Sequence, residues 1–185
     1  MSEFNNLTEK KLSSEEIFDG KILHVQRDTV ELPNGEKATR EVIRHVGAVC
    51  IVPLTDDGNV IVERQFRYPL DKVITEIPAG KLDSKDEDRL EAAKRELREE
   101  TGITADRWQD LGFYYPAAAY TDEVLSMYLA QGLHYGMQEL DNDEFLNFRP
   151  VPLDQLVNDI ISGRIADGKT QAAILKTAFL VMSEG

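Results

Sequence analysis

The chain has 185 residues, of which 42% are hydrophobic and 30% are charged, and its formal net charge is −13 at pH 7. This balance is typical of a globular protein of one domain with a hydrophobic core. The acidic charge argues against a broad nucleic-acid-binding surface, because phosphate neutralisation requires clustered Lys and Arg side chains.

The ends and the cysteine content point to a protein of the cytoplasm. The N-terminal stretch "MSEFNNLTEKK" is polar and lacks the apolar segment of a signal peptide. No apolar run approaches the roughly 18 residues that a membrane-spanning helix needs. The single cysteine, Cys50, excludes an internal disulfide framework. We therefore expect a cytoplasmic protein without membrane segments.

The first half of the chain predicts strands. Residues 1–14 are polar and are expected to form a loose arm. Residues 20–45 alternate apolar and polar side chains around "PNGE", which is typical of a β-hairpin. The apolar run 47–54 predicts a strand buried on both faces, and after the turn "TDDGN" the segment 60–67 is expected to pair back onto it. Residues 73–78 predict a short strand.

The periodicity then becomes helical. Residues 86–101 place apolar side chains at helical spacing, and Gly102 stands where a glycine often ends a helix. The remaining segments predict three strands and then two amphipathic helices: 108–115, 124–133, 143–151, 153–162 and 169–182. We predict a mixed α/β fold with an N-terminal part of arm and hairpin over 1–45 and a main domain over 46–185.

Three carboxylates share one face of the helix predicted over 86–101. Residues three or four positions apart lie on the same side of a helix, so Glu96, Glu99 and Glu100 project together. Such a cluster is unfavourable because like charges repel, and a divalent cation such as Mg²⁺, which prefers oxygen ligands, relieves the repulsion. The adjacent Arg95 can fix one carboxylate through a bidentate contact. A charge run taken alone is better explained by a solvated face with ordinary ion pairs.

The surrounding sequence favours the metal-binding interpretation. The stretch "PAGKLDSKDEDRLEAAKRELREETGI" resembles the signature of the Nudix hydrolase family. Gly80 and Glu87 are separated by six residues here, where the signature has five. The positions that match are Gly80, Glu87, Arg95, Glu96, Leu97, Glu99, Glu100, Gly102 and Ile103.

The resemblance implies a fold, a cofactor and a set of ligands. The fold would be an α/β/α sandwich around a mixed sheet, with antiparallel strands at the N-terminus. Two or three Mg²⁺ or Mn²⁺ ions would bind to Glu96, Glu100 and the carbonyl of Ala79. Glu99 would complete the set directly or through water and contribute to catalysis with Arg95, whereas Glu87 would be a structural support.

Three further stretches resemble the ADP-ribose pyrophosphatase branch of the family: "ERQFRYP", "EIPAGKLD" and "YYPAAAYTDE". Arg67 is the leading candidate for the pyrophosphate, because a guanidinium offers forked donors to phosphate oxygens. The resemblance also places Arg40 and Glu41 near the substrate and Glu123 on a ribose hydroxyl. Members of this branch are usually homodimers that share their N-terminal strands, and we expect a homodimer here.

A general base is expected in the acidic loop "LDNDEFLNF", residues 140–148. Catalysis needs a carboxylate that takes a proton from the attacking water. The resemblance favours Glu144, with Glu139 and Asp143 as alternatives.

The predicted activity is metal-dependent hydrolysis of ADP-ribose to AMP and ribose 5-phosphate. A pyrophosphatase for another nucleoside diphosphate sugar, such as GDP-mannose, and a non-catalytic ADP-ribose-binding sensor are the alternatives. The sensor is disfavoured because the chain retains Glu96, Glu99 and Glu100.

Overall fold

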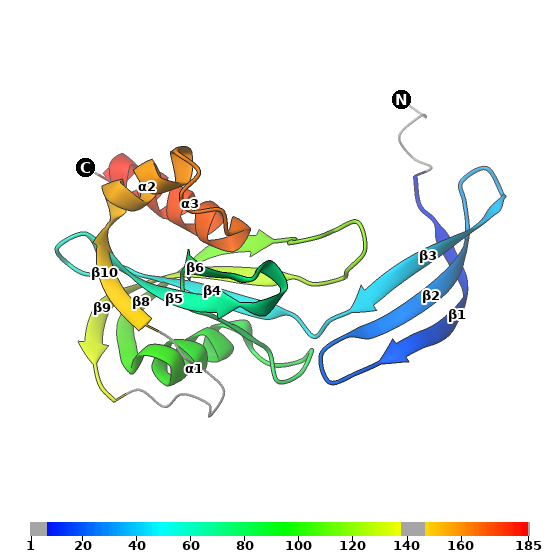
Figure 1. The fold of residues 1–185 in the computed structure, drawn as a ribbon, viewed down its shortest axis with the longest axis horizontal. Helices are drawn as coiled ribbons and strands as arrows, with labels where there is room; N and C mark the ends of the chain where they lie inside the picture. Colours follow the sequence, from blue (N-terminus) through cyan, green and yellow to red (C-terminus); the bar gives the residue numbers. More distant parts are fainter. Residues whose placement is uncertain (1–6, 138–146, 185) are drawn as a thin grey trace. The chain divides into compact units, whose positions relative to one another are not determined.

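The computed structural model of the chain describes residues 7–137 and 147–184 (Figure 1). It divides into two compact units. The N-terminal unit comprises the chain up to Val46 together with Ala117–Glu123, and the main unit comprises Gly47–Pro116 and the chain from Val124 onward.

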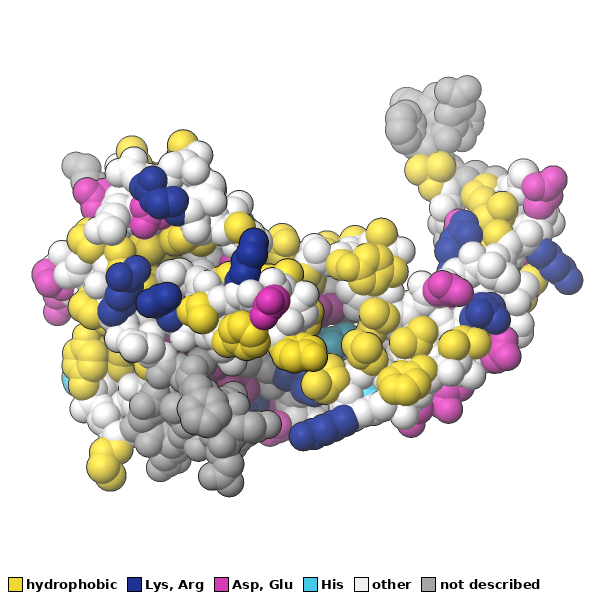
Figure 2. Space-filling model, in the orientation of Figure 1, with side chains coloured by type: hydrophobic (Ala, Val, Ile, Leu, Met, Phe, Trp, Pro, Cys, Tyr) yellow, Lys and Arg dark blue, Asp and Glu magenta, His cyan; other side chains and the backbone are white. Residues whose placement is uncertain are grey.

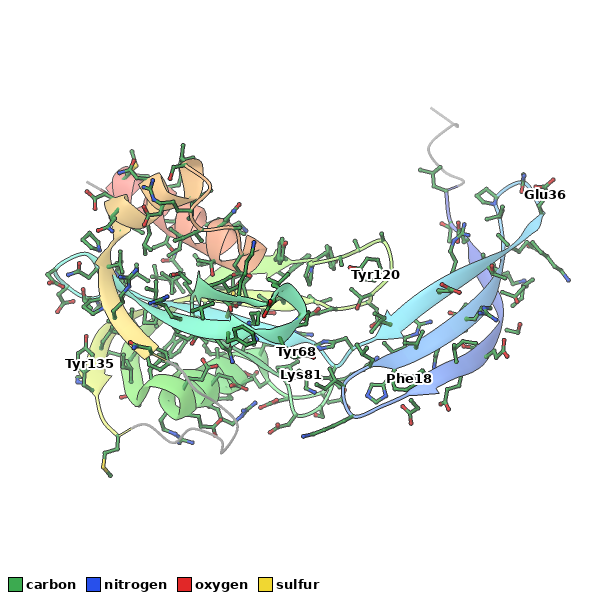
Figure 3. All side chains as sticks on the ribbon, viewed as in Figure 1. Phe18, Glu36, Tyr68, Lys81, Tyr120 and Tyr135 are labelled. Carbon is green, nitrogen blue, oxygen red and sulfur yellow. The ribbon has the colours of Figure 1, made fainter. Side chains whose placement is uncertain are left out.

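The N-terminal unit is built on an antiparallel sheet in which three strands follow one another in order. The hairpin predicted over 20–45 is confirmed, since β2 and β3 pair around a turn that contains Glu36 (Figure 3). The loose arm predicted over 1–14 is wrong, because a strand begins at Lys10. Its polar residues have partners on the neighbouring strand, which polarity alone does not reveal. The strands are β1 (Lys10–Asp19), β2 (His24–Glu31) and β3 (Lys37–Arg44).

Asp28 is the buried charge of this sheet. Its carboxylate accepts a hydrogen bond from Ser14 Oγ at 2.5 Å and pairs with Lys11 Nζ at 3.1 Å and Arg44 Nη2 at 2.6 Å. The residue is only 4% exposed. The hydrogen bond from Ser14 outweighs burial and, with Lys11 and Arg44, lowers the pKa of Asp28 below its ordinary value. Arg44 also reaches Asp122 in the segment 117–123, at 3.4 Å.

We expect acid to loosen this unit through Asp28. A lowered folded-state pKa contributes stability that is complete above the unfolded value of about 3.9 and is lost as pH falls through the folded value. Asp28→Asn should destabilise the unit by about 1–3 kcal/mol at pH 7, because it removes the charge that Lys11 and Arg44 share. Amide exchange of β1 and β2 at pH 7 and pH 3 measures both effects. Equal loss of protection on acidification in wild type and variant would contradict the assignment.

The main unit contains a mixed four-stranded sheet in the order β7-β4-β9-β8. Strands β4 and β9 run parallel and the other neighbours run antiparallel. Every residue of β4 is buried, as predicted for the apolar run 47–54. The strands are β4 (Ala48–Pro53), β7 (Ala79–Lys81), β8 (Ile103–Tyr114) and β9 (Leu125–Tyr135).

A second sheet has the order β10-β5-β6. The prediction that 60–67 pairs back onto 47–54 is wrong, since the two segments share only the bridge between Leu54 and Val60. The reason is that β7 and β9 occupy both edges of β4, so the chain leaves this sheet after the turn. The elements are β5 (Asn59–Arg67), the 3₁₀ turn η1 (Tyr68–Leu70), β6 (Lys72–Glu76) and β10 (Asn147–Pro152).

In the described part of the main unit, three helices cover the sheets. Helix α1 (Arg89–Thr101) lies on one side, and α2 (Leu153–Ile161) and α3 (Gly168–Glu184) lie together on the other (Figure 1). Apolar side chains from β4, β9, α2 and α3 form the core between these layers. This arrangement is the predicted α/β/α sandwich. No helix in the described part of the chain is long and apolar enough to cross a membrane.

Candidate active site

Helix α1 is held in place by a cap at each end. The carboxylate of Asp88 accepts hydrogen bonds from the backbone N–H groups of Leu90 and Glu91, which have no partner inside the helix. Gly102 ends the helix with φ of 71°, a left-handed conformation that glycine adopts without strain. Leu97 is fully buried beneath the helix. These contacts fix the rotation of α1 and therefore the direction of its carboxylates.

Gly80 and Glu96 meet so closely that a side chain at position 80 would displace the Glu96 carboxylate. A Cβ atom built on Gly80 would lie 2.0 Å from Oε2 of Glu96, far inside van der Waals contact. The carboxylate of Glu96 is thus seated against the backbone of β7. Gly80 is therefore required for its lack of a side chain, which leaves room for Glu96. It is not required for backbone conformation, since its φ is not positive.

Arg95 links three of the acidic side chains. Its Nη1 atom donates to Glu96 Oε1 at 2.8 Å and to Glu99 Oε2 at 3.2 Å, and its Nη2 atom donates to Glu87 Oε1 at 3.2 Å. It therefore contacts several carboxylates, and it holds that of Glu87 through two nitrogens, with Nε 3.3 Å from Oε1 and Nη2 3.5 Å from Oε2. Partial burial acts to lower the pKa of Arg95, but Glu96 and the other carboxylates outweigh it and raise that pKa above the ordinary value. Arg95 stays charged and orients the cluster.

Glu100 is hydrogen-bonded to Ala79, the residue whose carbonyl the signature implies as a metal ligand. It is 6% exposed, and its Oε2 atom accepts a hydrogen bond from the N–H of Ala79 at 3.1 Å. Ala79 faces Cys50 across β7 and β4, and the neighbouring Ile51 donates to Pro78 O at 2.9 Å. Ala79 is therefore a non-hydrogen-bonded position of the ladder, and its N–H and C=O both point away from β4. The carbonyl and the carboxylate of Glu100 lie on the same side of the strand.

The longer loop between Gly80 and Glu87 is closed by Glu87 itself. Glu87 Oε2 accepts a hydrogen bond from the N–H of Asp83 at 2.6 Å, and the N–H of Glu87 donates to Ser84 O at 3.3 Å. The loop starts at Lys81, which Figure 3 labels. The extra residue is thus absorbed within the loop, and the spacing between Glu87 and Arg95 keeps their contact.

The donor set suits a hard divalent cation. Within residues 7–137 and 147–184, no three carboxylate, histidine or cysteine side chains converge closely enough to enclose an ion by themselves. Mg²⁺ does not require such an enclosure, because it usually binds one or two carboxylates, several waters and substrate phosphates. Glu96, Glu100 and the Ala79 carbonyl are oxygen donors on neighbouring backbone segments. The residues therefore fit the ion that the signature implies.

A buried ionic cluster lies between β5, β6 and the start of α3, and sequence reasoning missed it. Glu76, which is 1% exposed, accepts hydrogen bonds from Arg67 Nε at 2.7 Å and from Arg67 Nη2 at 2.8 Å. Glu76 also pairs with Lys169, which contacts Asp167 Oδ2 at 3.1 Å. Burial acts to lower the pKa of Lys169, but Asp167 and Glu76 outweigh it and raise that pKa. The described hydrogen bonds use two of the five N–H donors of Arg67.

Glu76→Ala should destabilise the main unit by about 3–5 kcal/mol, because it removes the buried carboxylate that Arg67 and Lys169 share. Chemical denaturation followed by the fluorescence of Trp108 measures the change in the free energy of unfolding. Glu91→Ala, which removes an exposed partner of Lys94, is the matched control and should cost under about 1 kcal/mol. A loss at Glu76 as small as that at Glu91 would show that the cluster is dispensable.

The other predicted substrate residues belong to the N-terminal unit. Arg40 contacts Glu9, with 2.9 Å between Nε and Oε2. Glu41 lies 3.5 Å from Arg27, and Glu123 lies 3.9 Å from Nδ1 of His45. The predicted base, Glu144, and its alternatives, Glu139 and Asp143, lie outside the described residues.

Comparison with protein families identifies the chain. The profile of the Nudix domain matches residues 44–172, and that of the nucleoside diphosphate sugar hydrolase N-terminal domain matches residues 9–43. The chain therefore belongs to the Nudix family, and the resemblance seen in the signature is confirmed.

Individual relatives agree with this assignment. The chain is 40% identical to an ADP-ribose pyrophosphatase of Bacillus subtilis over 171 residues, which cover 91% of the chain and 92% of that protein. It is 40% identical to a methanol dehydrogenase activator of Bacillus methanolicus over 90% of each protein. A crystal structure of an ADP compounds hydrolase has the same fold, with a TM-score of 0.85 over 96% of each chain at 24% identity.

Proposed function

We propose that this protein hydrolyses the pyrophosphate bond of ADP-ribose to give AMP and ribose 5-phosphate. The observation that carries the proposal is the seating of Glu96 against Gly80 beside Glu100 and Ala79, in a chain similar to an ADP-ribose pyrophosphatase over nearly its whole length. The arrangement offers oxygen donors for divalent ions at the place where a diphosphate would be cleaved.

The proposal gives a role to each of the candidate site residues described in the main unit. Glu96, Glu100 and the Ala79 carbonyl hold two or three Mg²⁺ or Mn²⁺ ions, and Glu99 contributes directly or through water. The bound ions would offset the phosphate charge and lower the pKa of the attacking water. Arg95 orients Glu96 and Glu99 through the hydrogen bonds described above. The guanidinium of Arg67, held by Glu76, contacts the pyrophosphate.

The N-terminal unit is proposed to form a homodimer and to supply Arg40, Glu41 and Glu123 to the substrate. Exposed apolar side chains gather along its sheet (Figure 2), and patches of this kind commonly mark interfaces. Phe18, which is 55% exposed, is labelled in Figure 3. The large exposed apolar residues of the unit's strands and their connecting turn are Leu12, Ile17, Phe18, Ile22 and Leu23.

Glu144→Gln should lower kcat more than it raises KM, because a general base acts on the chemical step and not on binding. The expected loss is about 10²-fold in kcat, measured with ADP-ribose at saturating Mg²⁺. Asp143→Asn serves as the matched control within the same loop. If Asp143→Asn shows the larger loss, the base is Asp143 and the assignment to Glu144 is wrong.

A pyrophosphatase for another nucleoside diphosphate sugar is the second candidate, because residues 9–43 match a domain named after such hydrolases. A panel of ADP-ribose, ADP-glucose, GDP-mannose and UDP-glucose, compared by kcat/KM with Mg²⁺, separates the two. The highest value for ADP-ribose supports the proposal, and a higher value for GDP-mannose would replace the substrate. Binding of ADP-ribose without turnover would indicate a sensor.

A further inference from the structure

The backbone of Ile77–Ala79, which leads into the active site, is anchored by a residue far away in the sequence. The N–H of Ile77 donates to Oγ1 of Thr170, in the first turn of α3, at 3.0 Å. Both residues are fully buried. A buried backbone N–H without an acceptor is destabilising, and Thr170 supplies the acceptor for a group that solvent cannot reach.

The hydroxyl of Thr170 is oriented by Asp167. Asp167 stands directly before α3, and its Oδ2 atom accepts from Thr170 N at 2.9 Å and from Thr170 Oγ1 at 2.6 Å. The hydroxyl hydrogen is therefore committed to Asp167, which leaves the oxygen lone pairs for the N–H of Ile77. Lys169, the residue before Thr170, pairs with Glu76, the residue before Ile77. The start of α3 therefore contacts the end of β6 and the residue after it through two successive pairs, Lys169 with Glu76 and Thr170 with Ile77.

Three consecutive residues are consequently fixed from three directions. Ile77 is held by Thr170, Pro78 O accepts from Ile51 N of β4, and the N–H of Ala79 donates to Glu100. Peptide groups are planar and nearly rigid, so a rotation at Ile77 changes the direction of the Ala79 carbonyl two residues later. The hydrogen bond at Thr170 therefore controls an atom on the metal-facing side of the strand.

We propose that Thr170, oriented by Asp167, is a positioning residue that sets the direction of the Ala79 carbonyl and of the Glu100 carboxylate bound to its N–H. This inference rests on the proposed function, since it takes these two groups to be metal ligands. Thr170 does not touch substrate or metal and acts through the backbone of Ile77–Ala79.

The test compares three substitutions in α3. Thr170→Val keeps the shape and removes the acceptor, and Thr170→Ser keeps the hydroxyl. Thr177→Val is the matched control, because Thr177 is equally buried and its Oγ1 atom has no hydrogen-bond partner among the described residues. The measurements are Mn²⁺ affinity by electron paramagnetic resonance, amide exchange of Ile77 without metal, kcat/KM with ADP-ribose, and Tm.

Thr170→Val is expected to weaken Mn²⁺ binding and kcat/KM by roughly 10-fold or more, as is common for partners that orient metal ligands, and to speed exchange at Ile77. Thr170→Ser and Thr177→Val should stay near wild type in all of these. If Thr170→Val lowers only Tm, with Mn²⁺ affinity unchanged, the residue is structural and the proposal is wrong.

Two further outcomes are separable. If Thr170→Val does not fold, Asp167→Asn, which keeps the volume and weakens the acceptor for the hydroxyl, must weaken Mn²⁺ binding, and unchanged affinity would overturn the proposal. If wild-type protein hydrolyses no nucleoside diphosphate sugar, the proposed function fails. Metal affinity and amide exchange still decide the role of Thr170 in that case, because neither depends on turnover.

Discussion

Glu100→Gln is expected to lower kcat for ADP-ribose by about 10²-fold or more while the fold stays intact. The glutamine amide keeps the volume of the side chain, and its oxygen can still accept the N–H of Ala79, but the negative charge that would bind the ions is lost. Charge stabilisation by bound metal supplies much of the rate in this chemistry.

The measurement is kcat at saturating ADP-ribose over a range of Mg²⁺ concentrations, with Tm recorded for each variant. Glu91→Gln is the control, since Glu91 lies on the same helix, is exposed, and pairs only with Lys94 among the described ion pairs. Turnover by Glu100→Gln close to that of Glu91→Gln would rule out Glu100 as a metal ligand.

Gly80→Ala should lower Mn²⁺ affinity and kcat/KM by about 10- to 100-fold with only a small change in Tm. The new Cβ would lie 2.0 Å from Glu96 Oε2, so the carboxylate has to move. The move is inexpensive for stability because the atoms displaced are the end of a flexible side chain. The backbone is not strained, since Gly80 has no positive φ.

Lys81→Ala provides the comparison for Gly80→Ala, because Lys81 is the next residue and its side chain is exposed. It should leave Mn²⁺ affinity near wild type. Gly80→Ala with full Mn²⁺ affinity would mean that the seat of Glu96 against β7 is not needed for metal binding.

The helix and its acidic face could be predicted because their determinants are local. The spacing of Ala93 and Leu97, the glycine at 102 and the carboxylates three and four residues apart all lie within a few turns. The signature also depends on short spacings, and the structure shows what two of its members do: Gly80 makes room for Glu96, and Glu87 closes the preceding loop.

Strand pairing was less predictable, because a partner is chosen by the whole fold. The turn after residue 54 suggested a hairpin, yet β4 pairs with β7 and β9, whose sequences lie far along the chain. The strand β1 was missed for a related reason. Its polar residues form hydrogen bonds and ion pairs with groups on β2, as Ser14 does with Asp28. A polar composition alone therefore predicted an arm where the chain forms a strand.

The cluster around Glu76 could not be found by spacing. Glu76 and Lys169 are separated by 93 positions, and only the packing of α3 against β6 brings them together. The one local signal was a glutamate that follows apolar residues in "VITEIP", since a buried carboxylate requires a cationic partner. The hydrogen bond between Ile77 and Thr170 spans the same distance in sequence and could not be predicted for the same reason.

Metal binding at α1 is tested most directly by titrating the purified protein with Mn²⁺ in the presence of a non-hydrolysable ADP-ribose analogue. Electron paramagnetic resonance reports the free ion, and the same titration is run on a variant with Glu96→Gln and Glu100→Gln. We expect wild-type protein to bind Mn²⁺ and the double variant to lose that binding while remaining folded. Equal binding by the two proteins, or no binding by wild type, would contradict the assignment of the site.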